Sequence, residues 1–121
     1  MPSSELTLIM PADSRFISTA RVAAASLAAE LDFSIDEIEE LQMGTNELIA
    51  ILTELAADND VPTVELRYLV LDQTIEVHGL INAAGIDVEL DILATQILDS
   101  VVDNYGFTGP TAHIVKHRAV G

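Results

Sequence analysis

The sequence contains no cysteine and no tryptophan, and its aromatic residues are limited to three Phe and two Tyr. Without cysteine, the chain has no disulfide, no thiolate metal ligand and no cysteine nucleophile, and this fits a cytoplasmic protein. No apolar run approaches the roughly 18 residues that a membrane span requires. The opening MPSSELTLIM shows no signal-peptide pattern. We therefore expect a soluble, cytoplasmic protein that does not bind membranes.

Basic residues are also scarce, because five Lys and Arg stand against 20 Asp and Glu and give a formal charge of -15. Such a charge repels nucleic-acid phosphates and anionic lipid heads, so direct binding to nucleic acid is not expected. It also makes a polyanion such as ATP harder to hold. The charge is explained first by solubility, and the functional interpretation is attraction to a basic protein partner.

The hydrophobic pattern predicts a single domain over residues 1–121 with the element order β-α-α-β-β-α-β. Alternating apolar and polar residues predict strands in ELTLIM (5–10), TVELRYLVL (63–71), TIEVHGLI (74–81) and TAHIVKHR (111–118). Helical spacing of apolar residues predicts helices near residues 13–31, 34–57 and 89–105, with Gly106 as the last C-cap.

Local start signals support these boundaries. Ser34 and Glu37 form an S-x-x-E capping box, and Asp13 or Ser14 is placed to cap the first helix. A short turn at residues 72–73 joins two of the strands into a hairpin. The predicted fold class is an α/β two-layer sandwich of the α+β type. It has a four-stranded, mostly antiparallel sheet with three helices on one face.

The second predicted helix, within LQMGTNELIAILTEL, carries Asn46 and Glu47 side by side. Taken alone, they are a surface amide and a solvated acid. However, the phrases LTLIMPADSRFISTARVAAASLA, DFSIDEIEELQMGTNEL and LATQILDSVVDNYGFTGPTAHIVKHR resemble the anti-sigma-factor serine/threonine kinases. These belong to the ATPase superfamily of histidine kinases, gyrase and heat-shock chaperones. The resemblance covers nearly the whole chain.

The resemblance implies a nucleotide helix in which a glutamate activates the attacking group and an asparagine four residues later holds magnesium. It places the glutamate on Glu47, the candidate catalytic residue, and the asparagine on Ile51. Isoleucine cannot coordinate magnesium, because that ion needs oxygen ligands. A rival register places the asparagine on Asn46 and the glutamate on Gln42, and it also breaks the pair.

Two glycine boxes of the family also lack a match. In VHGLINAAGID, Gly79 and Gly85 are too far apart, and the nearest aspartate, Asp87, follows them. In VELDILA there is no glycine, and Glu89 and Asp91 would occupy the positive end of the helix that attracts phosphate. The resemblance thus implies a degenerate ATP site, with no bound cofactor and no metal.

We therefore expect a regulatory protein-binding module that resembles an anti-sigma factor and acts without ATP turnover. The resemblance implies a basic sigma factor or a small antagonist protein as the partner, and it implies a homodimer. The alternative is an active serine/threonine kinase that binds Mg-ATP and uses Glu47 as its base. A third hypothesis is a subunit that serves only assembly.

Two lesser candidates remain. Arg21 resembles a recurrent arginine of the family's first helix, although a surface arginine paired with an acid is an equal interpretation. His113 and His117 are four residues apart on a predicted strand, which separates them by roughly 13 Å at about 3.3 Å per residue. His78 can approach them only across strands, so no metal site is expected there.

Overall fold

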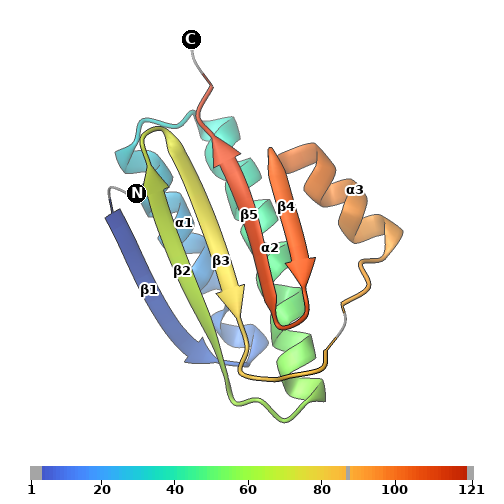
Figure 1. Cartoon of the computed structure of the whole chain (residues 1–121). Helices are drawn as coiled ribbons and strands as arrows, with labels where there is room; N and C mark the ends of the chain where they lie inside the picture. Colours follow the sequence, from blue (N-terminus) through green and yellow to red (C-terminus); the bar gives the residue numbers. More distant parts are fainter. Residues whose placement is uncertain (1–3, 87, 120–121) are drawn as a thin grey trace.

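The computed structural model describes residues 4–86 and 88–119 of the chain, as five strands and three α-helices (Figure 1). The strands are β1 (Ser4–Pro11), β2 (Thr63–Leu71), β3 (Thr74–Leu80), β4 (Asn104–Thr108) and β5 (Thr111–His117). The helices are the 3-10 turn η1 (Ser14–Phe16), α1 (Ile17–Glu30), α2 (Ile35–Asp58) and α3 (Ile92–Val101).

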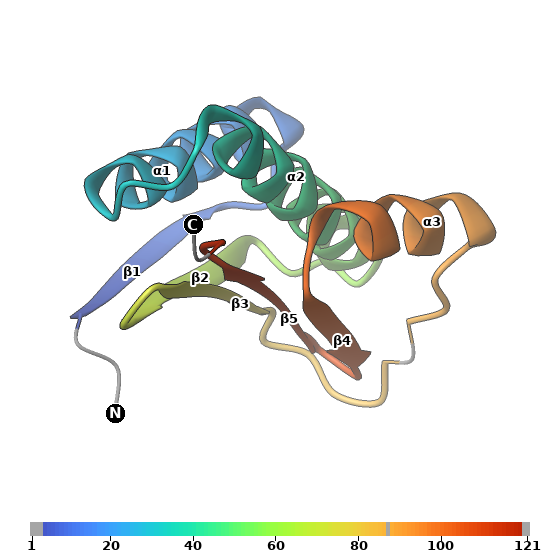
Figure 2. The ribbon, with the colours of Figure 1, turned by 90° about the horizontal axis from the view of Figure 1, so that it is seen from above.

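The strands form one sheet in the order β1-β2-β3-β5-β4, and every neighbouring pair is antiparallel. All three α-helices lie on one side of this sheet, and none of the helices of residues 4–86 and 88–119 lies on the other face (Figure 2). The predicted α+β class, antiparallel sheet and three helices are confirmed. The predicted number of four strands is wrong, because a fifth strand precedes the last one.

The error lies after the third helix, which was expected at 89–105. The Asp91 carboxylate accepts a hydrogen bond from the Ala94 N–H at 2.7 Å, so this capping residue starts α3 later than expected. The helix then ends at Val101. The missing strand β4 follows directly, and it converts the predicted order into β-α-α-β-β-α-β-β.

Tyr105 and Gly106 belong to β4, and Gly106 is therefore not a helix C-cap. Tyr105 and Phe107 alternate along the strand and pack against the hydrophobic core on the helical side. Gly106 faces the opposite side, where the ring of His113 from β5 lies over it. A methyl group at Gly106 would come within 2.7 Å of that ring.

The predicted capping box at the start of α2 is confirmed. The Glu37 N–H donates to the Ser34 hydroxyl at 3.1 Å, and the Ser34 N–H donates to the Glu37 carboxylate at 2.8 Å. The Ala119 N–H near the C-terminus donates to the same carboxylate. These two backbone donors, Ser34 first, hold the pKa of Glu37 below its ordinary value. The box thus fixes both the start of α2 and the end of the last strand.

Ser34→Ala is expected to lower the free energy of unfolding by about 1 kcal/mol, because one N–H of the first turn loses its acceptor. Ser26→Ala is the matched control, since Ser26 is an exposed interior residue of α1. Its effect should stay within about 0.5 kcal/mol, as alanine is the better helix former. Urea unfolding of the three proteins measures both values, and equal effects would contradict the capping argument.

Small residues allow the helices to approach the sheet closely. Ala20, Ala24 and Ala28 of α1 are fully buried, and the Tyr68 hydroxyl of β2 donates to the Ala20 carbonyl at 2.9 Å. Burial raises the pKa of that hydroxyl. This packing fixes the position of α1 over the sheet, and α2 lies between α1 and α3 (Figure 2).

A buried cation links the sheet to the other two helices. Lys116 of β5 points to the helical side and is only 8% exposed. Its ammonium donates to the Glu40 carboxylate of α2 at 3.3 Å and to the Val101 carbonyl of α3 at 2.9 Å.

None of the helices in residues 4–86 and 88–119 has the length and apolar character needed to cross a lipid bilayer.

Candidate functional site

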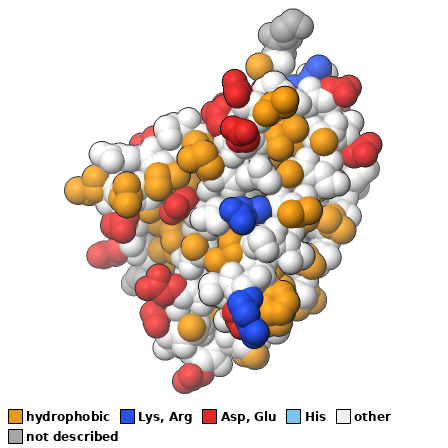
Figure 3. Space-filling model, turned by 180° about the vertical axis from the view of Figure 1, so that it is seen from behind, with side chains coloured by type: hydrophobic (Ala, Val, Ile, Leu, Met, Phe, Trp, Pro, Cys, Tyr) orange, Lys and Arg blue, Asp and Glu red, His pale blue; other side chains and the backbone are white. Residues whose placement is uncertain are grey.

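The outer surface of the helical layer contains a groove of about 570 Å³ to which all three helices contribute. We call it the helical groove. It is lined by Ser18, Arg21 and Val22 of α1, by Glu39, Gln42, Met43, Asn46 and Glu47 of α2, and by Ile97 of α3. Figure 3 shows this side of the molecule, where blue basic side chains lie among orange hydrophobic ones.

The helical groove brings Arg21 of the first helix together with the three residues of the second helix that the sequence analysis singled out. Glu47, Asn46 and Gln42 lie on one face of α2, and Arg21 of α1 lines the same groove. Arg21 is exposed, and it is the one Lys or Arg side chain for which residues 4–86 and 88–119 show neither an ion pair nor a hydrogen bond. Its guanidinium therefore keeps its donors for a ligand or partner.

Apolar side chains also line this groove and are partly exposed there, whereas such side chains are normally buried. Val22 is 63% exposed and Met43 is 50% exposed, and Ile97 of α3 is half-buried beside them. Methionine adapts its shape to different contact surfaces, and exposed apolar groups within a polar rim are typical of protein-binding surfaces. The groove therefore offers exposed apolar side chains, the carboxylates of Glu39 and Glu47, and the Arg21 guanidinium, which has no partner among the described residues.

Ile51, which the resemblance pairs with Glu47, lines a different depression. This second depression, of about 310 Å³, lies between the C-terminal half of α2 and the segment that leads into α3. We call it the acidic depression. Its lining residues are Ile51, Glu54, Leu55 and Asp58 of α2, Val88 to Asp91 of the connecting segment, and Ala94 of α3. The acidic depression thus lies between helix α2 and the segment before α3, the two parts of the chain that the resemblance compares with a nucleotide site.

The acidic depression is unfavourable for a magnesium-bound triphosphate. Its lining includes four carboxylates, from Glu54, Asp58, Glu89 and Asp91, and neither Lys nor Arg is among the described lining residues. A triphosphate would meet repulsion from all four groups. The Asp91 carboxylate also accepts the N–H of Ala94 and so occupies the helix end that attracts phosphate. Asp91 thus lies at the start of α3 as predicted, whereas Glu89 lies before the helix.

The residues that the sequence analysis compared with the family's first glycine box do not line the acidic depression among the described residues. Gly79 is buried on the helical side of β3, where an added Cβ would lie 2.2 Å from Leu52 Cδ1. Gly85 lies in an exposed loop with a φ of 71°, a conformation that favours glycine. Asp87 lies outside the described residues. Gly79 therefore provides space for α2 rather than for a ligand.

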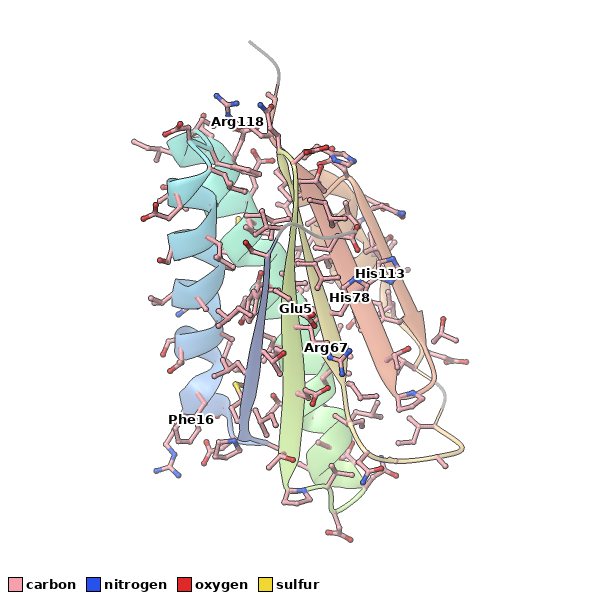
Figure 4. All side chains as sticks on the ribbon, turned by 60° about the vertical axis from the view of Figure 1, so that its left-hand side comes forward. Glu5, Phe16, Arg67, His78, His113 and Arg118 are labelled. Atoms are coloured by element: carbon pink, nitrogen blue, oxygen red, sulfur yellow. The ribbon has the colours of Figure 1, made fainter. Side chains whose placement is uncertain are left out.

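The open face of the sheet carries a row of three basic or ionisable side chains. Arg67 of β2, His78 of β3 and His113 of β5 are direct neighbours in the strand register, and Figure 4 shows them on this face. The two imidazole rings stack with their centroids 5.5 Å apart. His78 also bonds to the Glu76 carboxylate at 2.8 Å. The predicted approach of His78 across strands is thus confirmed for His113.

This histidine pair lines a shallow depression of about 450 Å³ together with Arg67, Glu5 and Glu65. Arg67 lies 3.4 Å from Glu65 and 3.9 Å from Glu5, so acids already neighbour the cation of this row. Among the described residues, no group of three or more His, Cys, Asp or Glu is arranged to hold a metal ion.

Comparison of the sequence with models of protein families and with curated proteins gives no match. The resemblance to anti-sigma-factor kinases, and the catalytic role that it implies for Glu47, therefore stay predictions.

Sequence reasoning missed the apolar part of the helical groove. The helical period puts Met43 on the same face of α2 as Glu47, but it gives no reason to link Met43 with Val22 on another helix. The sequence signal that could have indicated this surface is Met43, a large apolar residue on the polar face of an amphipathic helix. The carboxylates of Glu54 and Asp58 were also missed, because their neighbours come from α3 and the segment before it.

Proposed function

We propose that this chain is a regulatory protein-binding module that contacts its partner through the helical groove and acts without ATP turnover. The observation that carries the proposal is the exposure of Val22 and Met43 beside Arg21, which has neither an ion pair nor a hydrogen bond among the described residues. Aromatic, methionine and arginine side chains are enriched at protein interfaces, whereas isolated exposed apolar residues on a surface need no explanation. Here they share one groove.

The partner is a basic protein, and the sequence resemblance proposes a sigma factor or an antagonist of anti-sigma factors. The support is electrostatic, because a chain of 121 residues with a charge of -15 produces a field that attracts a positively charged surface. Glu39 and Glu47 supply carboxylates at the groove itself. Complementary charge raises the encounter rate, while the apolar anchors hold the complex together.

Mg-ATP is expected not to change the melting temperature of the protein, because four carboxylates surround the place where the resemblance puts the nucleotide. A ligand at 100 times its dissociation constant would add about 2.7 kcal/mol of stability, which a thermal melt detects readily. Calorimetric titration with Mg-ATP is the second measurement. A low-micromolar dissociation constant would favour the alternative, an active serine/threonine kinase with Glu47 as its base.

Ile51→Asn provides a useful control for this titration. It restores the oxygen ligand that the resemblance requires, but it leaves Glu54, Asp58, Glu89 and Asp91 in place. We expect this variant to bind no Mg-ATP either. Binding by Ile51→Asn alone would show that the acids do not exclude the nucleotide, and that one side chain separates this chain from an ATPase.

A further inference from the structure

The depression on the open face of the sheet combines charges of both signs with aromatic rings. We call it the sheet depression. Its volume of about 450 Å³ is within the roughly 300–1,000 Å³ of small-molecule sites. Glu5, Glu65 and Arg67 form its charged part, and His78 and His113 form its aromatic part. Figure 4 shows four of these side chains on the face opposite the helices, so the sheet depression is separate from the helical groove.

The Arg67 guanidinium has donors that the protein does not use. Its Nε lies 3.4 Å from a Glu65 oxygen and 3.9 Å from a Glu5 oxygen, and the arginine side chain is 56% exposed. Exposed ion pairs of this kind contribute little to stability, and among the described residues the guanidinium makes no hydrogen bond. An arginine binds a carboxylate through two parallel N–H donors, and glutamate oxygens accept from an ammonium group. A bound molecule can therefore replace these weak pairs.

The aromatic part offers a flat surface beside these charges. The rings of His78 and His113 are inclined by only 20°, with their centroids 5.5 Å apart. The Glu76 carboxylate bonds to the His78 ring, and the absence of a side chain at Gly106 leaves space for the His113 ring. Leu80, which is 40% exposed, lines the same depression. An aromatic group of a ligand can stack on the imidazoles and contact this leucine.

The charges of the sheet depression favour a ligand that carries both signs. Glu5, Glu65 and the chain charge of -15 oppose a plain anion, whereas Arg67 opposes a plain cation. A zwitterion satisfies both sets of groups. In an α-amino acid, standard bond lengths place the ammonium nitrogen about 3 Å from a carboxylate oxygen. The opposite charges of the protein have a similar separation, 3.4 Å and 3.9 Å.

We infer that the sheet depression binds a free α-amino acid with an aromatic side chain. Arg67 binds the carboxylate, Glu5 and Glu65 accept the ammonium N–H groups, and the aromatic ring lies against the two imidazoles. A peptide terminus does not fit this site, because its end residue carries only one of the two charges. The chain thus has a small-molecule site on the face opposite its proposed protein-binding groove.

Titration with L-phenylalanine, followed by calorimetry, tests the site. The expected dissociation constant is about 1 mM or below. N-acetyl-L-phenylalanine lacks the ammonium and L-phenylalaninamide lacks the carboxylate, so each should bind about tenfold or more weakly, because charged groups of the protein stay unpaired. Equal binding of the N-acetyl compound would indicate a site for anions or peptide C-termini, and equal binding of the amide a site for cations. Either result would overturn the proposal, as would no binding at about 10 mM L-phenylalanine.

Arg67→Gln is expected to weaken the binding of L-phenylalanine about tenfold or more, because it removes the cation that binds the carboxylate. Arg21→Gln is the matched control, since Arg21 is also an exposed arginine but lines the helical groove. It should leave the affinity for the amino acid unchanged. Equal affinities of the two variants for L-phenylalanine would refute the assignment of Arg67.

The same two variants separate this site from the proposed protein-binding function. Arg67→Gln should leave the binding of a protein partner at the helical groove unchanged, because the two sites lie on opposite faces of the sheet. Failure of amino-acid binding would therefore leave the groove proposal intact, and the reverse also holds. Unchanged melting temperatures of the free variants show that a loss of binding is not a loss of fold.

Discussion

Leu52→Ala is expected to lower the free energy of unfolding by about 2–5 kcal/mol, because it removes a fully buried side chain and leaves a cavity. Leu52 lies on the core face of α2, directly above Gly79 of β3. An added Cβ at Gly79 would come within 2.2 Å of Leu52 Cδ1 and 3.1 Å of Leu48 Cδ2. The Leu52 side chain therefore fills the space that a side chain at position 79 would occupy.

Gly79→Ala in the wild-type chain is expected to cost about 1–3 kcal/mol, because the new methyl group overpacks the core. In the Leu52→Ala background the same methyl enters the vacated space, and its cost should fall or change sign. The two substitutions should therefore differ from additivity by about 0.5–3 kcal/mol. Denaturant unfolding of the four proteins in the cycle measures this coupling.

Leu98→Ala provides the matched control for the cycle. Leu98 is equally buried but lies on α3, and the atoms nearest to a Gly79 methyl belong to Leu48, Leu52 and Leu66. Gly79→Ala and Leu98→Ala should add within about 0.5 kcal/mol. Strict additivity of Gly79→Ala with Leu52→Ala would contradict the packing role of Gly79.

The elements that the sequence predicts well are those with local signals. The capping box of Ser34 and Glu37 requires only four consecutive residues, and the hairpin turn after Leu71 requires only the alternation on either side of it. Both are present as expected. The hydrogen bonds that define them form between near neighbours, so the surrounding fold changes them little.

Strand β4 shows why other elements cannot be predicted from the local sequence pattern. It has five residues, it follows α3 almost directly, and its interior contains Gly106, which weakens a strand signal. Its alternation rests on Tyr105 and Phe107 alone. The spacing of Leu98, Val101 and Tyr105 also fits a continuing helix, so the period does not separate the two states. Pairing with β5 decides between them, and that contact is not local in the sequence.

The candidate site was predictable only in part, for the same reason. The helical period places Met43 and Glu47 on one face of α2, but Arg21 and Val22 join them through the packing of α1 against α2. The position of α1 over the sheet is itself set by a contact with another element, the hydrogen bond from the Tyr68 hydroxyl of β2 to the Ala20 carbonyl. A groove of this kind depends on the relative positions of three helices, and the pattern within one helix does not contain that information.

The rate of association with a basic partner is expected to fall about tenfold or more as salt is raised from low to physiological concentration and beyond. At physiological ionic strength screening limits the field of the 20 acids to about 8 Å, so long-range attraction is lost first. The partner is isolated by pull-down from a native extract, and stopped-flow measurements at two salt concentrations give the rates. An acidic specific partner, or a rate independent of salt, would contradict this prediction.

Met43→Asp should weaken the same complex about 30-fold, the equivalent of roughly 2 kcal/mol, because it places a charge on the apolar anchor of the helical groove. Ile35→Asp is the matched control: Ile35 is an exposed apolar residue of the same helix, and it is not among the residues that line the groove. Its affinity should stay within a few fold of wild type. Equal losses from both variants would show that charge alone, and not the groove, controls binding.

Glu47→Ala distinguishes the proposed protein-binding module from the alternative, an active kinase. Glu47 is half-buried at the edge of the helical groove, so its removal costs one solvated carboxylate and should change the affinity only a few fold. A kinase would instead lose its base, and phosphate transfer to the partner would stop while binding continued. Radiolabelled ATP added to the purified complex distinguishes the two cases, because a transfer that disappears in Glu47→Ala would establish the enzyme and reject the contact-only mechanism.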